Sequence, residues 1–161
     1  FQGVVSRAPG APVPDAPGAG LSVSEAPLAA LARDLDLALV CSGTASLEVA
    51  LAGVPHALVY RTSPLTYALA RRLVRLEWIG LANLVLERPR ERPLVREFVQ
   101  DAARPADLAA DLADWLASGP RRARFASGVD ELRERLGGAG FWDRAADEVV
   151  SLLRERRGAG R

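Results

Sequence analysis

The order of apolar and polar residues predicts strands that alternate with helices in the first two thirds of the chain. Residues 37–41 and 56–60 are almost continuously apolar, which is typical of strands buried on both faces of a parallel sheet. A further strand and its exit are expected within 78–86. Helices are predicted where apolar residues recur every three or four positions, over about 25–34, 44–52 and 64–76. Gly53 and Pro55 end the second of these helices, and Pro64 begins the third.

From Val95 onward the pattern is helical. Three apolar stripes follow one another at helical spacing: Leu108, Leu112, Trp115 and Leu116, then Phe125, Val129, Leu132 and Leu136, then Trp142, Ala146, Val149 and Leu153. Asp107, Asp111 and Asp114 lie on the side of the same predicted helix opposite the first stripe. The last stripe is expected to fold back onto the chain, to pack on a second copy in a swapped homodimer, or to remain exposed as an apolar patch.

These elements divide the chain into three parts. Residues 1–24 are a loop-rich N-terminal segment, because 8–20 contain four prolines and three glycines. Residues 25–117 form a Rossmann-like region in which strands alternate with helices. Residues 118–161 form C-terminal packing helices. The predicted fold class is therefore α/β, with a helical tail.

The composition excludes several kinds of function. All 21 basic residues among the 161 are arginine, so the chain has neither a Walker-type phosphate lysine nor a Schiff-base lysine. The net charge of +1 gives no overall basic signature for nucleic acid. No apolar run approaches the roughly 18 residues that span a bilayer, and no secretory signal opens the sequence. Because the chain contains no methionine and begins with Phe1, we expect a fragment of a longer protein.

The turn after the first predicted strand is the first candidate site, because open α/β sheets bind ligands at the carboxyl ends of their strands. Ser42, Gly43 and Thr44 combine hydroxyl groups, close backbone approach and the free N–H groups of a helix start, which favour phosphate. Glu48 lies one turn further along the same helix face, where its carboxylate suits ribose hydroxyls. The alternative interpretation is that Thr44 only caps the helix and Glu48 is a surface charge.

The other reactive residues are weaker candidates for a functional site. Cys41 ends an apolar strand without a cationic neighbour in sequence, so it is expected to be buried and inert. His56 is the only histidine, and a structural role is expected for it. Ser42 lacks the Gly-x-Ser-x-Gly elbow of serine hydrolases. No metal site is expected, because the sequence has no cluster of histidine, cysteine and carboxylates at ligand spacing.

Several ordered motifs together resemble lipid-A-disaccharide synthases, members of glycosyltransferase family 19. The resemblance covers about residues 25–117, and it is carried by 42–48 (SGTASLE), 53–55 (GVP), 59–61 (VYR), 63–66 (SPLT), 70–74 (ARRLV), 81–84 (LANL) and 97–100 (EFVQ). It implies one Rossmann-like half of a two-domain GT-B enzyme.

The resemblance also implies a reaction. Such enzymes transfer 2,3-diacylglucosamine from UDP to 2,3-diacylglucosamine 1-phosphate with inversion, releasing UDP, and require neither metal nor cofactor. The residues that this chain would contribute to the UDP-sugar donor site are Ser42, Gly43, Thr44, Glu48, Arg61, Asn83, Glu97 and Gln100. Ser42 to Thr44 would line the diphosphate, Glu48 would face the ribose, and Arg61 would lie near the diphosphate or the acceptor phosphate.

Three positions depart from the family pattern beside this site, namely Ala82, Glu87 and Arg88. The upstream strand–helix units and the acceptor half with its carboxylate base are not found, so binding without turnover is expected. Location in the cytoplasm, peripheral on the inner membrane, is also implied, with Arg71, Arg72 and Arg75 facing anionic lipid or only solvent. The alternatives are another UDP-sugar enzyme of GT-B architecture, or a noncatalytic remnant that acts as an interaction module.

Overall fold

The computed structural model describes residues 2–7, 10, 20–41, 43–73, 76–87, 93–137 and 140–158, with side chains described as far as 154. The predicted site residue Ser42 and the position Arg88 lie outside the described residues, as does Arg75.

A three-stranded parallel sheet forms the centre of the fold. Its strands are β3 (Ala38–Cys41), β4 (His56–Tyr60) and β5 (Arg96–Val99), in the spatial order β3-β4-β5. A second parallel pair joins β1 (Gly3–Ser6) to β2 (Leu21–Ser24). Strands alternating with helices around a parallel sheet confirm the α/β, Rossmann-like prediction.

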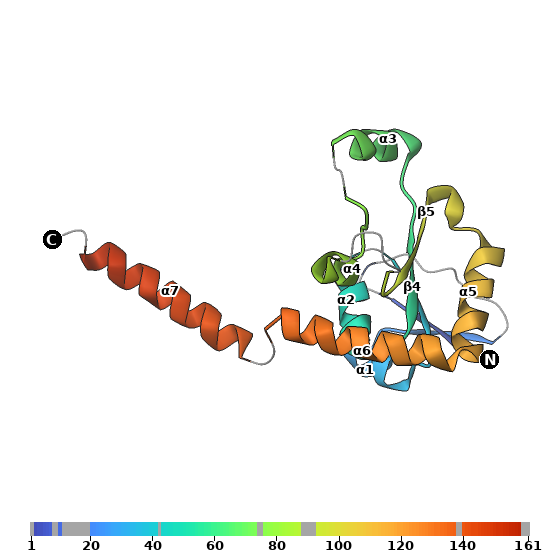
Figure 1. Ribbon diagram of the computed structural model, residues 1–161, viewed down its shortest axis with the longest axis horizontal. Helices are drawn as coiled ribbons and strands as arrows, with labels where there is room; N and C mark the ends of the chain where they lie inside the picture. Colours follow the sequence, from blue (N-terminus) through green and yellow to red (C-terminus); the bar gives the residue numbers. More distant parts are fainter. Residues whose placement is uncertain are drawn as a thin grey trace.

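Seven helices and two 3-10 turns are described along the chain. They are α1 (Leu28–Leu31), α2 (Thr44–Leu51), α3 (Pro64–Leu73), α4 (Leu81–Leu86), α5 (Pro105–Ala117), α6 (Gly119–Arg135) and α7 (Phe141–Gly158), with 3-10 turns η1 (Ala32–Asp34) and η2 (Gln100–Ala102). Helices α2 and α4 lie on one side of β4 and α5 lies on the other, while α6 runs beneath them (Figure 1). Helix α7 projects away from the body.

The main core lies between β4 and the helices α4, α5 and α6. Leu58, Trp115 and Leu132 are almost completely buried there, and Trp115 meets Phe125 edge to face with ring centroids 5.5 Å apart. Burying side chains of this size is the main stabilising contribution to such a fold. The predicted stripes thus contribute to this core in part: Trp115 of α5 and Phe125, Val129 and Leu132 of α6 lie in it, whereas Leu116 is 47% exposed and Leu136 is 38% exposed.

Two segments have a different secondary structure from the one predicted. Residues 81–86, expected within a strand region, form helix α4, and 96–99, expected to be helical, form strand β5. The run Leu-Ala-Asn-Leu-Val-Leu is a short apolar segment, for which periodicity does not distinguish strand from helix. In β5 only Phe98 is fully buried, and a strand of four residues is too short for the apolar pattern to reveal it.

Strand β3 differs from its prediction in burial. Because it pairs only with β4 in the described sheet, it is an edge strand: Leu39 is 49% exposed and Cys41 is an exposed free cysteine. The prediction that Cys41 is buried was therefore wrong. The sequence also did not predict β1 and β2 within the loop-rich segment 1–24.

One aspartate of α5 is buried although it lies opposite the predicted apolar stripe. The Asp111 side chain is 1% exposed and accepts a 2.8 Å hydrogen bond from Nη2 of Arg121, which lies on α6. The guanidinium of Arg121 also stacks on the Trp115 ring, 3.8 Å from its centroid. This stacked ion pair ties α5 to α6, so Asp111 serves the packing of the two helices.

Candidate functional site

The carboxyl edge of the β3-β4-β5 sheet brings together three of the predicted site segments. Cys41 is in register with Val59, and Tyr60 with Val99, so the three strands end side by side. The segments that begin with Gly43, Arg61 and Gln100 therefore leave the sheet at one edge. This is the edge at which open α/β sheets bind ligands.

The turn before α2 has an open backbone. Gly43 precedes the helix with φ 140° and ψ −168°, and a Cβ added there would meet no atom within 4 Å. The Ser46 hydroxyl donates to the Gly43 carbonyl at 2.9 Å and ties the turn to the buried side of α2. Thr44 is the first helical residue and is exposed, so Gly43, rather than Thr44, occupies the N-cap position. An exposed helix start without a side-chain cap leaves backbone donors available to an anion.

Glu48 and Arg61 both extend from this edge into solvent. Glu48 lies on α2 one turn after Thr44, and its side chain is exposed. Arg61 follows the last residue of β4 and is also exposed. An exposed cation and an exposed carboxylate near this edge suit a ligand that carries both phosphates and hydroxyl groups.

Gln100 is bound to the backbone that follows Arg61. Its Oε1 accepts from the Thr62 amide at 2.8 Å, and its Nε2 donates to the Thr62 carbonyl at 3.0 Å. Gln100 itself has a φ of +53°, a left-handed conformation that is uncommon for a residue other than glycine. This two-bond contact joins the exits of β4 and β5, so Gln100 positions the Arg61 segment.

Glu97 and Asn83 form a polar network beneath the edge. The Glu97 carboxylate accepts from the Ile79 and Gly80 amides, both at 2.9 Å, and from Nδ2 of Asn83 at 2.8 Å. Asn83 is buried, and it also donates to the Val95 carbonyl at 2.7 Å and accepts from the Val95 amide at 3.1 Å. The network fixes the start of α4 against β5, since Ile79 and Gly80 directly precede that helix.

The positions that depart from the family pattern lie around the same helix. Ala82 is buried inside α4, and Glu87 ends the helix in a left-handed conformation with φ 45°. Neither side chain belongs to the Glu97 network. The network is therefore intact despite these changes.

His56 is fully buried at the start of β4, at the opposite end of the strand from Arg61. Its Nδ1 lies 3.0 Å from the Val54 carbonyl oxygen, and its ring meets Phe125 edge to face. Burial lowers the pKa of His56 from its ordinary value of 6.5, and the bond to Val54 opposes this only in part. This placement agrees with the expected structural role.

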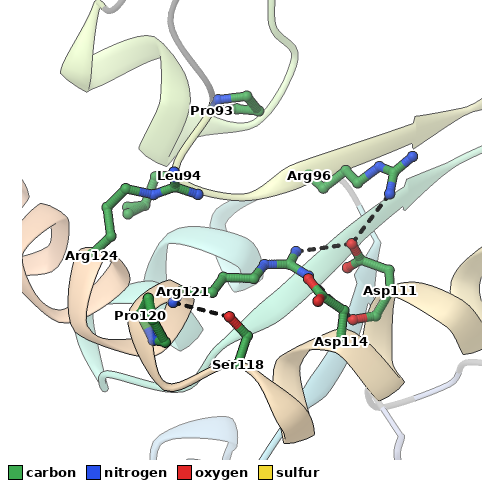
Figure 2. A pocket seen from close by; sticks show the side chains of 9 residues that line it. All are labelled: Pro93, Leu94, Arg96, Asp111, Asp114, Ser118, Pro120, Arg121 and Arg124. Atoms are coloured by element: carbon green, nitrogen blue, oxygen red, sulfur yellow. Dashed lines mark hydrogen bonds and ion pairs between the residues drawn. The ribbon is translucent and has the colours of Figure 1, made fainter.

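A pocket of about 600 Å³ opens at the other end of the fold, where β5 begins and α5 meets α6. Figure 2 shows Arg121 reaching from α6 toward Asp111 and Asp114, while Arg96 approaches Asp111 from β5. Because these charges are largely paired with one another and the pocket lies at the amino edge, we do not assign the ligand site there. Arg124 completes the charged lining.

The part of the chain that the structure describes contains no group of three or more histidine, cysteine or carboxylate side chains suited to a metal ion. Within the same part, no helix has both the length and the apolar character needed to cross a membrane.

Comparison with known proteins decides the family. The family model described as lipid-A-disaccharide synthetase matches residues 21–141, three quarters of the chain, from β2 to the first residue of α7. The chain belongs to this family. Its members are glycosyltransferases of lipid A biosynthesis in bacteria.

Curated relatives agree with this assignment. The chain is 40% identical over 119 residues to the lipid-A-disaccharide synthase of Synechocystis sp., covering 73% of this chain and 29% of that enzyme. It is 36% identical over 127 residues to the enzyme of Trichlorobacter lovleyi, covering 78% and 32%, and 34% identical over 135 residues to that of Geobacter metallireducens, covering 79% and 34%. The chain thus spans about a third of the length of these lipid-A-disaccharide synthases.

Proposed function

We propose that this chain is the donor-binding part of a lipid-A-disaccharide synthase and that it binds the UDP portion of UDP-2,3-diacylglucosamine. The observation that carries the proposal is the meeting of the Gly43 turn, Glu48 and the Arg61 segment at the carboxyl edge of the sheet, in a chain of this family. The diphosphate lies against the Ser42–Thr44 turn, with Arg61 close to it. Glu48 accepts hydrogen bonds from the ribose hydroxyls.

The remaining site residues hold the neighbouring backbone segments in place through hydrogen bonds. Gln100 holds the Arg61 segment through Thr62, and Glu97 with Asn83 holds the start of α4. Hydrogen bonds within the fold occupy these three side chains. We assign them a positioning role in donor binding, whereas the Ser42–Thr44 turn, Glu48 and Arg61 contact the nucleotide.

The full reaction needs more than this chain. We infer that the longer enzyme transfers the diacylglucosaminyl group to 2,3-diacylglucosamine 1-phosphate at the surface of the inner membrane, with inversion and without a cofactor. An inverting transfer requires a base that takes the proton from the acceptor hydroxyl. The chain spans about a third of the length of its relatives, and we place this base in the part of the enzyme that the chain does not span. The chain alone is therefore expected to bind UDP without turnover.

Isothermal titration calorimetry with UDP tests the donor site. Wild-type chain should bind, and Glu48→Ala should raise Kd about tenfold, the effect of losing roughly 1.4 kcal/mol of charge-assisted hydrogen bonding. Arg61→Ala should weaken binding similarly and make it less sensitive to salt. Glu134→Ala is the matched control, because Glu134 is an exposed glutamate on α6. Equal heats for Glu48→Ala and Glu134→Ala would contradict the proposal.

A second candidate function, an interaction module, is favoured by α7. This helix carries an exposed apolar face that includes Trp142, which is 81% exposed, with Val149 and Leu153 at helical spacing. We infer that α7 exchanges with a second copy of the chain to form a swapped homodimer. Sedimentation velocity over a range of concentrations should reveal dimers that Trp142→Ser abolishes. A wild-type chain that is monomeric at every concentration would exclude this role.

A further inference from the structure

Helix α6 contacts the C-terminal ends of both α2 and α4 through two arginines. Figure 1 shows α6 running beneath these helices, on the side away from the carboxyl edge of the sheet. Nη2 of Arg133 donates to the carbonyl of Leu51, the last residue of α2, at 2.7 Å. Nη1 of Arg135 donates to the carbonyl of Leu86, the last residue of α4, at 2.7 Å, and to that of Val85 at 3.0 Å. One helix thus caps the ends of two others.

These contacts meet a need that α2 and α4 do not meet themselves. The last carbonyl groups of a helix have no partner within it, and the C-terminus carries a partial negative charge that a nearby cation stabilises. Neither α2 nor α4 has a basic residue in its own last turn. Arg133 and Arg135 therefore supply from α6 the donors and the positive charge that both helix ends lack.

Both guanidinium groups are held in place on α6. Asp130 Oδ1 accepts from Nη1 of Arg133 at 2.9 Å, and Oε1 of Glu131 lies 2.9 Å from Nη2 of Arg135. Helix α6 is itself anchored in the core by Leu132, which is completely buried between these side chains in sequence. The two arginines therefore extend from a helix whose own position the core determines.

The opposite ends of α2 and α4 lie toward the carboxyl edge of the sheet. Helix α2 begins directly after Gly43, and α4 begins after Gly80, whose amide donates to the Glu97 carboxylate at 2.9 Å. With eight and six residues, the two helices are only about 12 Å and about 9 Å long. Because internal hydrogen bonds make such short helices move as units, displacement of one end also displaces the other.

We propose, on the basis of the donor site proposed above, that Arg133 and Arg135 are positioning residues for UDP. By attaching the C-terminal ends of α2 and α4 to one helix, they fix the separation of these two helices and the placement of the Gly43 turn. A phosphate that binds backbone donors is bound more tightly when those donors are already in place. Loss of the two arginines lowers the affinity for UDP without removing any group that touches it.

Calorimetry with UDP on the whole chain tests the proposal. Arg133→Ala/Arg135→Ala should raise the Kd about fivefold, an effect typical of residues that act on a ligand through others. Arg133→Lys/Arg135→Lys should restore most of the affinity, because an ammonium group donates to the same carbonyl oxygens. Arg104→Ala is the matched control, since Arg104 is an exposed arginine that also pairs with an aspartate three positions away, Asp107, but at the start of α5. Its Kd should equal that of the wild-type chain.

Nuclear magnetic resonance of the UDP-free chain separates positioning from a general loss of stability. The amide signals of Gly43 and Gly80 should shift by more than a line width in the double alanine variant and return in the double lysine variant. The Arg104→Ala variant should leave both signals in place. Each single alanine variant removes one helix cap only, so it provides the same test if the double variant does not fold.

Two results would overturn the proposal. One is a wild-type Kd in the double alanine variant, and the other is a Kd that the lysine and alanine substitutions raise equally. If the wild-type chain itself does not bind UDP, the proposed donor site fails. The Gly43 and Gly80 signals then still decide whether the two arginines position α2 and α4.

Discussion

Replacing Glu97 by alanine should destabilise the fold strongly, although the side chain is only half-buried. The change removes an acceptor that serves the Ile79 and Gly80 amides at 2.9 Å and Asn83 Nδ2 at 2.8 Å. A hydrogen bond to a charged group contributes about 1.5–3 kcal/mol, and water replaces part of three such bonds at a half-buried site. We therefore expect a loss of about 2–4 kcal/mol in the free energy of unfolding.

Urea unfolding followed by far-ultraviolet circular dichroism measures this loss. With a slope of about 2 kcal/mol per molar urea, a loss of 3 kcal/mol lowers the midpoint by about 1.5 M. Glu97→Gln keeps Oε1 for Gly80 and Asn83 but loses the acceptor for Ile79, so it should lie between alanine and wild type. Glu134→Ala, on the exposed face of α6, should stay within about 0.5 kcal/mol of wild type. A Glu97→Ala midpoint equal to that of Glu134→Ala would refute the reasoning.

Three further predictions concern other parts of the fold. His56 is buried with a lowered pKa, so the unfolded chain binds a proton at His56 below pH 6.5 before the folded chain does. The free energy of unfolding should therefore decrease as the pH is lowered, by up to about 1.4 kcal/mol per pH unit. His56→Leu should reduce this slope in urea titrations from about pH 7 to about pH 5. Asp111→Ala leaves Arg121 without its buried partner and should cost about 3 kcal/mol in the same assay, whereas Asp107→Ala, at an exposed pair, should cost under about 1 kcal/mol. Cys41 is exposed, so Ellman's reagent should label it in the native protein without urea; a thiol that reacts only after unfolding would contradict the position of β3.

The sequence predicts this fold best where the apolar pattern is long or strongly bounded. Strand β4 has the predicted limits of 56–60, and α3 begins at Pro64 as expected. The prediction fails for 81–86 and 96–99, where elements of four to six residues are too short for periodicity to decide. Burial of Asp111 was also unpredictable, because its partner Arg121 comes from the next helix.

The candidate site is also only partly predictable from the local sequence. The turn at Gly43 and the nearby Glu48 follow from a strand-to-helix transition that local sequence reveals. The roles of Asn83, Glu97 and Gln100 depend on contacts across 14 to 38 positions of the chain, which local sequence does not encode. The resemblance singled out these positions, while their bonding to backbone amides emerges only from the fold.

The exposed edge of β3 has a consequence for the handling of the chain in solution. An edge strand offers unpaired backbone groups to any other strand, and β3 carries no charged residue or proline that would discourage such pairing. Leu39 and Cys41 point to the same side of the strand, so two edges that meet there also bring two thiols close together. Concentrated, unreduced samples are therefore expected to accumulate covalently linked, sheet-extended aggregates. Association that a Cys41→Ser variant and a reducing agent both suppress has this origin, and it is distinct from exchange of α7.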